Sequence, residues 1–149
     1  MAQQRRPSMI RLTFALLITG LTSRYSPGVM QATINARVEM GQLSAHSVAA
    51  HDGYVAVLDC GRIGDTLWIM VNDGRHWQTG ELVDGGRWQR VLVTDCAARQ
   101  NWDGTQEWMR ANNILTELDY QTAARYGFTH LGAVPVVVSE VRPMIEVGR

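Results

Sequence analysis

The chain has 149 residues, which leaves room for one domain of about 120 residues after a leader, a usual size for a single hydrophobic core. Its 14 basic and 14 acidic residues balance to a net charge of zero. All the basic residues are Arg, and they are spread along the chain without a dense run. Nucleic-acid binding through phosphate neutralisation is therefore not expected.

The first 24 residues have the features of an export leader. Arg5, Arg6 and Arg11 give a basic start, and residues 12–21 (LTFALLITGL) form an apolar run that is too short to span a bilayer. We predict a leader over residues 1–24, with a disordered tail or an uncleaved anchor as alternatives. The folded domain is then expected over residues 25–149, in a secreted or cell-envelope protein.

Cys60 and Cys96 are the two cysteines of the chain. In an oxidising compartment they can form a disulfide, and two buried free thiols are the alternative. No Cys-x-x-Cys pair is present, and the four His residues show no metal-ligand spacing. We therefore expect neither a metal nor another cofactor.

The rest of the chain is dominated by short apolar runs that are rich in Val, Ile and Thr and are bounded by Gly, Asp and Asn, a pattern typical of strands. A helix is predicted between Asp119, which can cap its first turn, and Gly127, which can end it. Residues 107–112 could add another helical turn. Many short strands with one or two short helices indicate a mainly β fold that closes into a small barrel. The predicted strands are residues 54–58 (YVAVL), 66–71 (TLWIMV), 89–94 (QRVLVT), 113–118 (NILTEL) and 134–141 (VPVVVSEV).

Taken in this order, the segments resemble the double-psi β-barrel domain of rare lipoprotein A, which is related to barwin and to the first domain of expansins. The resemblance covers most of residues 25–141 and implies a six-stranded barrel. Residues 25–28 (YSPG) are similar to the opening segment of that family, and residues 93–95 (VTD) lie where it has a strand ending in Asn-Asp-Arg-Gly. Residues 117–119 (ELD) lie where the family has Asp-Leu-Ser before the helix. Residues 132–136 (GAVPV) resemble its closing strand.

The resemblance implies a secreted barrel that binds peptidoglycan strands, and some members of the family cleave them as lytic transglycosylases. Asp95 matches the acidic residue of the family at the barrel mouth, where it would act as general acid and then as base. Glu117 is the second catalytic candidate. The family's His-containing segment reads LDCGRIG here, at residues 58–64. The alternative is therefore a non-catalytic, barwin-like module that binds polysaccharide or a protein partner.

Both acids also have a purely structural interpretation. Asp95 could accept backbone amides or meet Arg99 at the end of a strand, and Glu117 could be a solvated charge. The expected partner is cell-wall polysaccharide, bound by a monomer that has no stable membrane span once the leader is removed. Aromatic residues in polar stretches are candidates for stacking against its sugar rings, with loop packing as the alternative: Tyr25, Trp88, Trp102 and Trp108.

Overall fold

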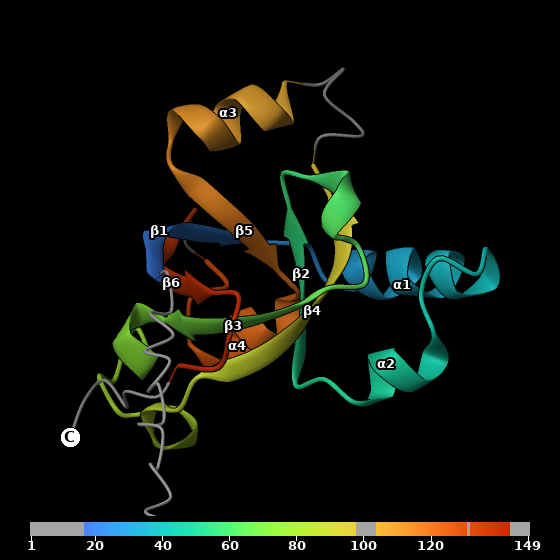
Figure 1. Cartoon of the computed structure of the whole chain (residues 1–149). Coiled ribbons are helices and arrows are strands. Elements are labelled where there is room, and N and C mark those ends of the chain that lie inside the picture. Colours follow the sequence, from blue (N-terminus) through green and yellow to red (C-terminus); the bar gives the residue numbers. More distant parts are fainter. Residues whose placement is uncertain (1–16, 98–103, 131, 144–149) are drawn as a thin grey trace, which may run out of the picture.

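The computed structural model describes residues 17–97, 104–130 and 132–143. Within these ranges six strands close into a mixed barrel in the order β1-β5-β2-β4-β3-β6 (Figure 1). The prediction of a mainly β, six-stranded closed barrel is confirmed. The strands are β1 (Leu17–Arg24), β2 (Gly53–Val57), β3 (Thr66–Val71), β4 (Gln89–Cys96), β5 (Ile114–Leu118) and β6 (Val134–Ser139).

Four α-helices accompany the barrel in the described ranges, which is more than the one or two that the sequence predicted. They are α1 (Val29–Glu39), α2 (Ala45–Ala49), α3 (Thr105–Ala111) and α4 (Tyr120–Arg125). The predicted α4 is confirmed, because the Asp119 carboxylate accepts a hydrogen bond from the Thr122 amide (3.0 Å) and Gly127 follows with a φ of 73°. Short 3-10 turns complete the elements: η1 (Cys60–Arg62), η2 (Asn72–Gly74) and η3 (Asp84–Gly86).

The two halves of the barrel have the same pairing pattern. β1 runs parallel to β5 and antiparallel to β6, and β4 runs parallel to β2 and antiparallel to β3. Exchanging β1, β2 and β3 with β4, β5 and β6 therefore leaves the list of strand neighbours unchanged. This arrangement is compatible with the double-psi barrel that the family resemblance implies.

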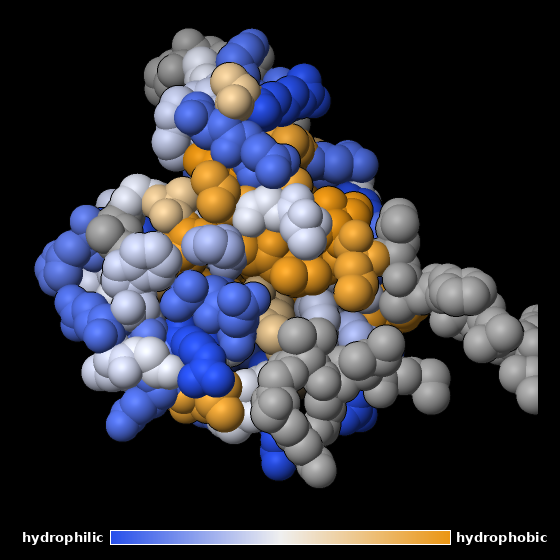
Figure 2. Space-filling view, turned by 90° about the vertical axis from the view of Figure 1, so that its left-hand side faces the viewer, coloured by the Kyte–Doolittle hydropathy of each residue, from blue (hydrophilic) through white to orange (hydrophobic). Residues whose placement is uncertain are grey.

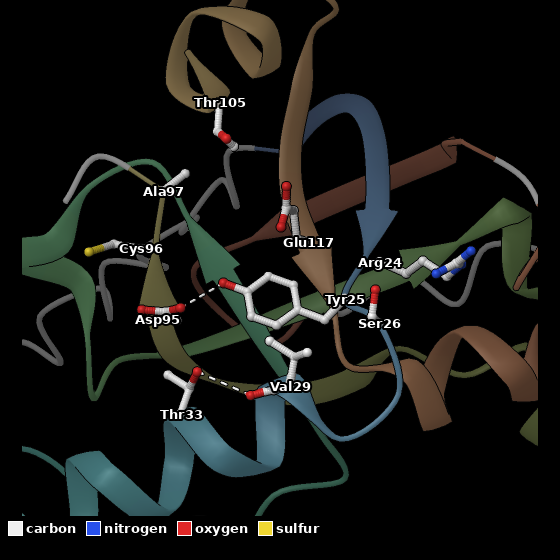
Figure 3. A pocket seen from close by; sticks show the side chains of 10 residues that line it. All are labelled: Arg24, Tyr25, Ser26, Val29, Thr33, Asp95, Cys96, Ala97, Thr105 and Glu117. Atoms are coloured by element: carbon white, nitrogen blue, oxygen red, sulfur yellow. Dashed lines mark hydrogen bonds between the residues drawn. The ribbon is translucent and has the colours of Figure 1, made fainter. Parts of the chain in front are cut away.

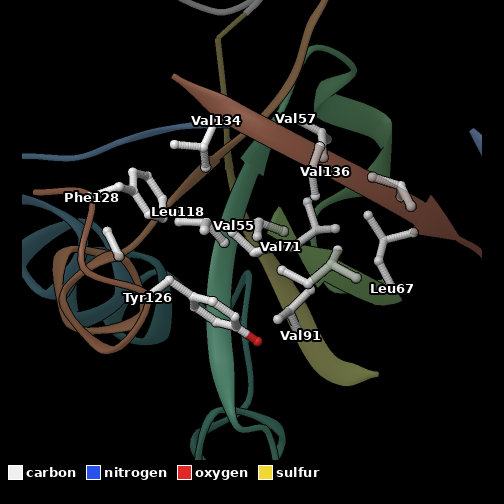
Figure 4. Close-up of a cluster of buried hydrophobic side chains, with 14 residues drawn as sticks. Val55, Val57, Leu67, Val71, Val91, Leu118, Tyr126, Phe128, Val134 and Val136 are labelled. Atoms are coloured by element: carbon white, nitrogen blue, oxygen red, sulfur yellow. The ribbon is translucent and has the colours of Figure 1, made fainter. Parts of the chain in front are cut away.

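The barrel interior is filled mainly by β-branched side chains, which suit a pleated surface (Figure 4). Val55, Ile69 and Val91 are completely buried there. Tyr126 and Phe128, which follow α4, cover the core from one side and are buried to 0% and 1% exposure.

The barrel begins inside the segment that the sequence analysis assigned to the leader. Leu17–Arg24 forms β1, which pairs with β5 on one side and with β6 on the other. The domain boundary at residue 25 is therefore wrong for the barrel, and residues 25–28 form the turn between β1 and α1. A short apolar run has the same composition in a leader and in a buried strand, so periodicity did not separate the two. Residues 1–16 lie outside the described residues.

The predicted disulfide is present between Cys60, the first residue of η1, and Cys96, the last residue of β4, with the two Cα atoms 5.0 Å apart. This bond ties the 3-10 turn after β2 to the end of the neighbouring parallel strand. Among the helices of the described residues, none has the length and apolar character needed to cross a bilayer.

Candidate functional site

A β-bulge in β4 turns Asp95 to the outside of the barrel. Val91 and Val93 point into the core, so simple alternation would point residue 95 inward as well. The pairing register of β2 and β4 shifts between Val55–Val93 and Ala56–Asp95, which leaves Thr94 as the extra residue. Asp95 consequently lies on the same outer face as Ala56, which α1 covers.

The register brings Glu117 to the same face. Glu117 pairs with Ala56 across the β5–β2 ladder, and Ala56 pairs with Asp95 across the β2–β4 ladder. The two acidic residues are thus two strand spacings apart at the backbone, about 9–10 Å. The small side chain of Ala56 lies between them, and in Figure 3 the Tyr25 ring lies beside both carboxylates. Two acids that are 22 residues apart in sequence therefore converge on one surface.

Both carboxylate oxygens of Asp95 are engaged. The Arg37 guanidinium donates through Nη2 to Oδ1, and the Tyr25 hydroxyl donates to Oδ2, each at 2.6 Å. Arg37 also donates through Nη1 to Gln42 Oε1 at 2.6 Å. Only 6% of the Arg37 side chain and 19% of the Asp95 side chain are exposed, so solvent screens the ion pair little. Both contacts stabilise the negative charge of Asp95.

This environment also determines the protonation state of the Tyr25 hydroxyl. Burial, the hydrogen bond to Asp95 and the negative charges of Asp95 and Glu117 raise the pKa of Tyr25 well above its usual value of 10.0, and the charge of Arg37 opposes them in part. The phenol therefore keeps its proton at neutral pH and acts as the donor in the bond to Asp95.

A pocket of about 400 Å³ opens over these groups (Figure 3). Its ten lining residues come from the end of β1 and the turn after it, the first turns of α1, the end of β4 and the residue after it, the first residue of α3, and β5. Hydroxyl groups of Ser26, Thr33 and Thr105 join the two carboxylates in its wall. Cys96 is also in the wall, so the disulfide anchors one side of the pocket.

Three of the residues proposed from the sequence line this pocket, namely Asp95, Glu117 and Tyr25. Trp88 does not, because it precedes the first residue of β4 and lies at the other end of that strand, about 20 Å along it from Asp95. Trp108 is 48% exposed on α3 and is not part of the pocket lining. Trp102 lies outside the described residues.

Arg37 was missed by the sequence analysis, which considered Arg99 as the cation that meets Asp95. Arg99 lies outside the described residues, and Arg37 forms the contact that the structure describes. Residues 37 and 95 are 58 positions apart, and no local pattern links them. In the described ranges no group of three or more His, Cys, Asp or Glu side chains is placed to hold a metal ion.

Comparison of the chain with protein-family models, with curated proteins and with solved structures found no match.

Proposed function

We propose that the protein is an extracytoplasmic, rare lipoprotein A-like barrel that binds cell-wall glycan strands in the pocket between α1 and α3. The convergence of Asp95, Glu117 and Tyr25 in that one pocket is the observation that carries the proposal. Carboxylate oxygens accept hydrogen bonds from sugar hydroxyls, and the exposed part of the aromatic ring offers a surface for the sugar C–H groups. The disulfide supports a location in an oxidising compartment.

Cleavage of the glycan strand, with Asp95 as general acid and base, is a second candidate. The presence of a second carboxylate, Glu117, in the same pocket favours it. Both carboxylate oxygens of Asp95 already accept a hydrogen bond from a protein group, which leaves fewer lone pairs to meet a glycosidic oxygen. Binding is for this reason the primary proposal.

The binding proposal is tested with the oxidised full chain and purified, insoluble peptidoglycan. We expect Glu117→Gln and Asp95→Asn to weaken retention at least tenfold while the near-UV circular dichroism of the fold is retained. Glu81→Gln and Asp73→Asn are matched controls, since both residues are exposed and lie outside the pocket. Equal retention of all four variants and the parent would exclude this pocket as the glycan site.

The same incubation tests cleavage. Release of anhydro-muropeptides by the parent chain and not by Asp95→Asn would establish the second candidate. Retention of the parent on peptidoglycan without any release of fragments would leave the protein as a binding module.

A further inference from the structure

A second pocket, of about 320 Å³, lies where the interior of the barrel opens to solvent. The starts of β1, β3 and β5 and the ends of β2 and β6 surround it, and it shares no residue with the glycan pocket. Figure 2 looks onto the side of the molecule where β1 begins, and apolar residues gather across the middle of that side, below α3.

The wall of this second pocket is apolar. Val57, Leu67 and Val138 belong to the barrel core, Leu115 packs against that core, and Ile18 stands half-exposed at the lip. Leu115 reaches its place because β1 has Gly20 opposite, where a Cβ atom would lie only 2.6 Å from Leu115 Cγ. The side chains of the wall thus form a concave apolar surface.

The one hydroxyl of the wall is already bonded. Thr116 donates through its hydroxyl to Thr22 Oγ1 at 2.8 Å, and the Thr22 hydroxyl lies 3.1 Å from the Thr116 carbonyl. A polar group of a ligand that entered the pocket would lose its hydrogen bonds to water. The Thr116 hydroxyl would not donate a hydrogen bond in their place. The wall therefore favours an apolar part of a ligand.

Charged residues lie at the rim of this pocket, where it meets solvent. Arg62 forms ion pairs with Asp65 and Glu140, each at 2.6 Å, and Asp59 adds a third carboxylate beside them. Of these charged residues Asp59, Glu140 and Arg62 line the pocket, and their charges sum to −1; Asp65 pairs with Arg62 but is not a lining residue. Such a rim attracts a cation and repels an anion.

We propose that this second pocket binds an aliphatic amphiphile with a positively charged head group. The chain lies against Ile18, Leu67 and Leu115, and the head lies beside Asp59 and Glu140. The volume of about 320 Å³ is at the lower end of the range for small-molecule pockets, which suits a single alkyl chain. This site is independent of the glycan proposal.

The test is a titration of the oxidised full chain with decyltrimethylammonium and with decyl sulfate, each below its micelle concentration, followed by calorimetry. The two probes share a chain and differ in head-group charge. We expect the cation to bind at least tenfold more tightly than the anion. Glu140→Gln should reduce this preference, because it removes one rim charge.

Two neighbouring residues give a matched pair of variants. Ile18 and Leu17 are 45% and 46% exposed, but successive residues of a strand point to opposite faces, and only Ile18 lines the pocket. Ile18→Gln should weaken binding of the cation at least tenfold, and Leu17→Gln should leave it unchanged. Equal binding of cation and anion, no binding of the cation by the parent, or equal losses in the two variants would each overturn the proposal.

Discussion

At the level of single residues, the ion pair between Arg37 and Asp95 is the most deeply buried charged contact of the pocket that Asp95 lines. Its two members are not equally buried, since 6% of the Arg37 side chain and 19% of the Asp95 side chain are exposed. Removing one partner leaves the other charge without compensation, and the cost rises with the burial of the charge that remains. The two single substitutions should therefore differ.

Asp95→Asn leaves the more deeply buried charge without its ionic partner, with only the neutral Gln42 amide still bonded to it, and is expected to lower the free energy of unfolding by about 3 kcal/mol. Arg37→Met leaves Asp95, which keeps its bond from Tyr25 and some access to water, and should cost less. Urea unfolding at neutral pH measures both values. If Arg37→Met lowered the free energy of unfolding more than Asp95→Asn does, burial of the remaining charge would not determine the cost.

Tyr126 provides a prediction about alkaline pH. Its ring is completely buried, its hydroxyl has no hydrogen-bond partner among the described residues, and burial raises its pKa to about 12. The unfolded chain releases this proton near pH 10, whereas the folded chain keeps it until about 12. Its contribution to stability is complete below pH 10 and declines between pH 10 and about 12, by about 1.4 kcal/mol per pH unit.

Tyr126→Phe should therefore flatten the loss of stability above pH 10, relative to the parent. At neutral pH the same variant should be more stable by about 1 kcal/mol, because it removes a buried hydroxyl that forms no bond. Tyr25→Phe serves as the contrast, since it removes the donor to Asp95 and should destabilise at neutral pH. Denaturant unfolding between pH 7 and pH 11 measures both effects; a parallel decline in Tyr126→Phe and parent would refute the assignment.

At the level of elements, the sequence predicted most strands because their composition is local. Residues 66–71 match β3 completely, and the other four predicted runs overlap β2, β4, β5 and β6. β1 was missed because its apolar residues also fit a leader. α1 was missed because no side chain caps its start and β-branched residues recur along it, which lowers helix propensity.

The bulge at Thr94 was also beyond the reach of sequence patterns. Period-two alternation in β4 points Asp95 into the core, and only the pairing with β2 shows the extra residue. Asp95, Glu117 and Tyr25 could be named from residue type and motif order, but their convergence depends on two strand registers that join distant segments. The candidate residues were thus predictable, and their arrangement was not.

The disulfide joins two elements, and its effect on the stability of the fold can be calculated. Cys60 and Cys96 are separated by 36 residues, and closing a loop of this length restricts the unfolded chain by about 4 kcal/mol in the chain-entropy model. The double substitution Cys60→Ser with Cys96→Ser should lower the free energy of unfolding by a comparable amount. Urea unfolding of this variant, with the reduced parent as a control, measures the loss; a difference below about 1 kcal/mol would contradict a stabilising role.

At the level of the whole molecule, closure depends on β1. This strand joins β5 to β6, and no other described strand bridges those two. Without β1 the barrel would become an open sheet with two exposed edges, which invites pairing with other chains. The turn that carries Tyr25 follows β1 directly, so the pocket lined by Tyr25, Asp95 and Glu117 depends on the same strand.

We therefore predict that a fragment of residues 25–149 does not fold, whereas a fragment of residues 17–149 does. The shorter fragment should lack near-UV circular dichroism and elute as aggregates in size-exclusion chromatography, and the longer one should match the full chain. If the protein is exported with cleavage of a leader, the new N-terminus must then lie at or before Leu17, which mass spectrometry of the exported protein would reveal. A folded, monomeric 25–149 fragment would mean that β1 is dispensable and would restore the boundary that the sequence pattern first indicated.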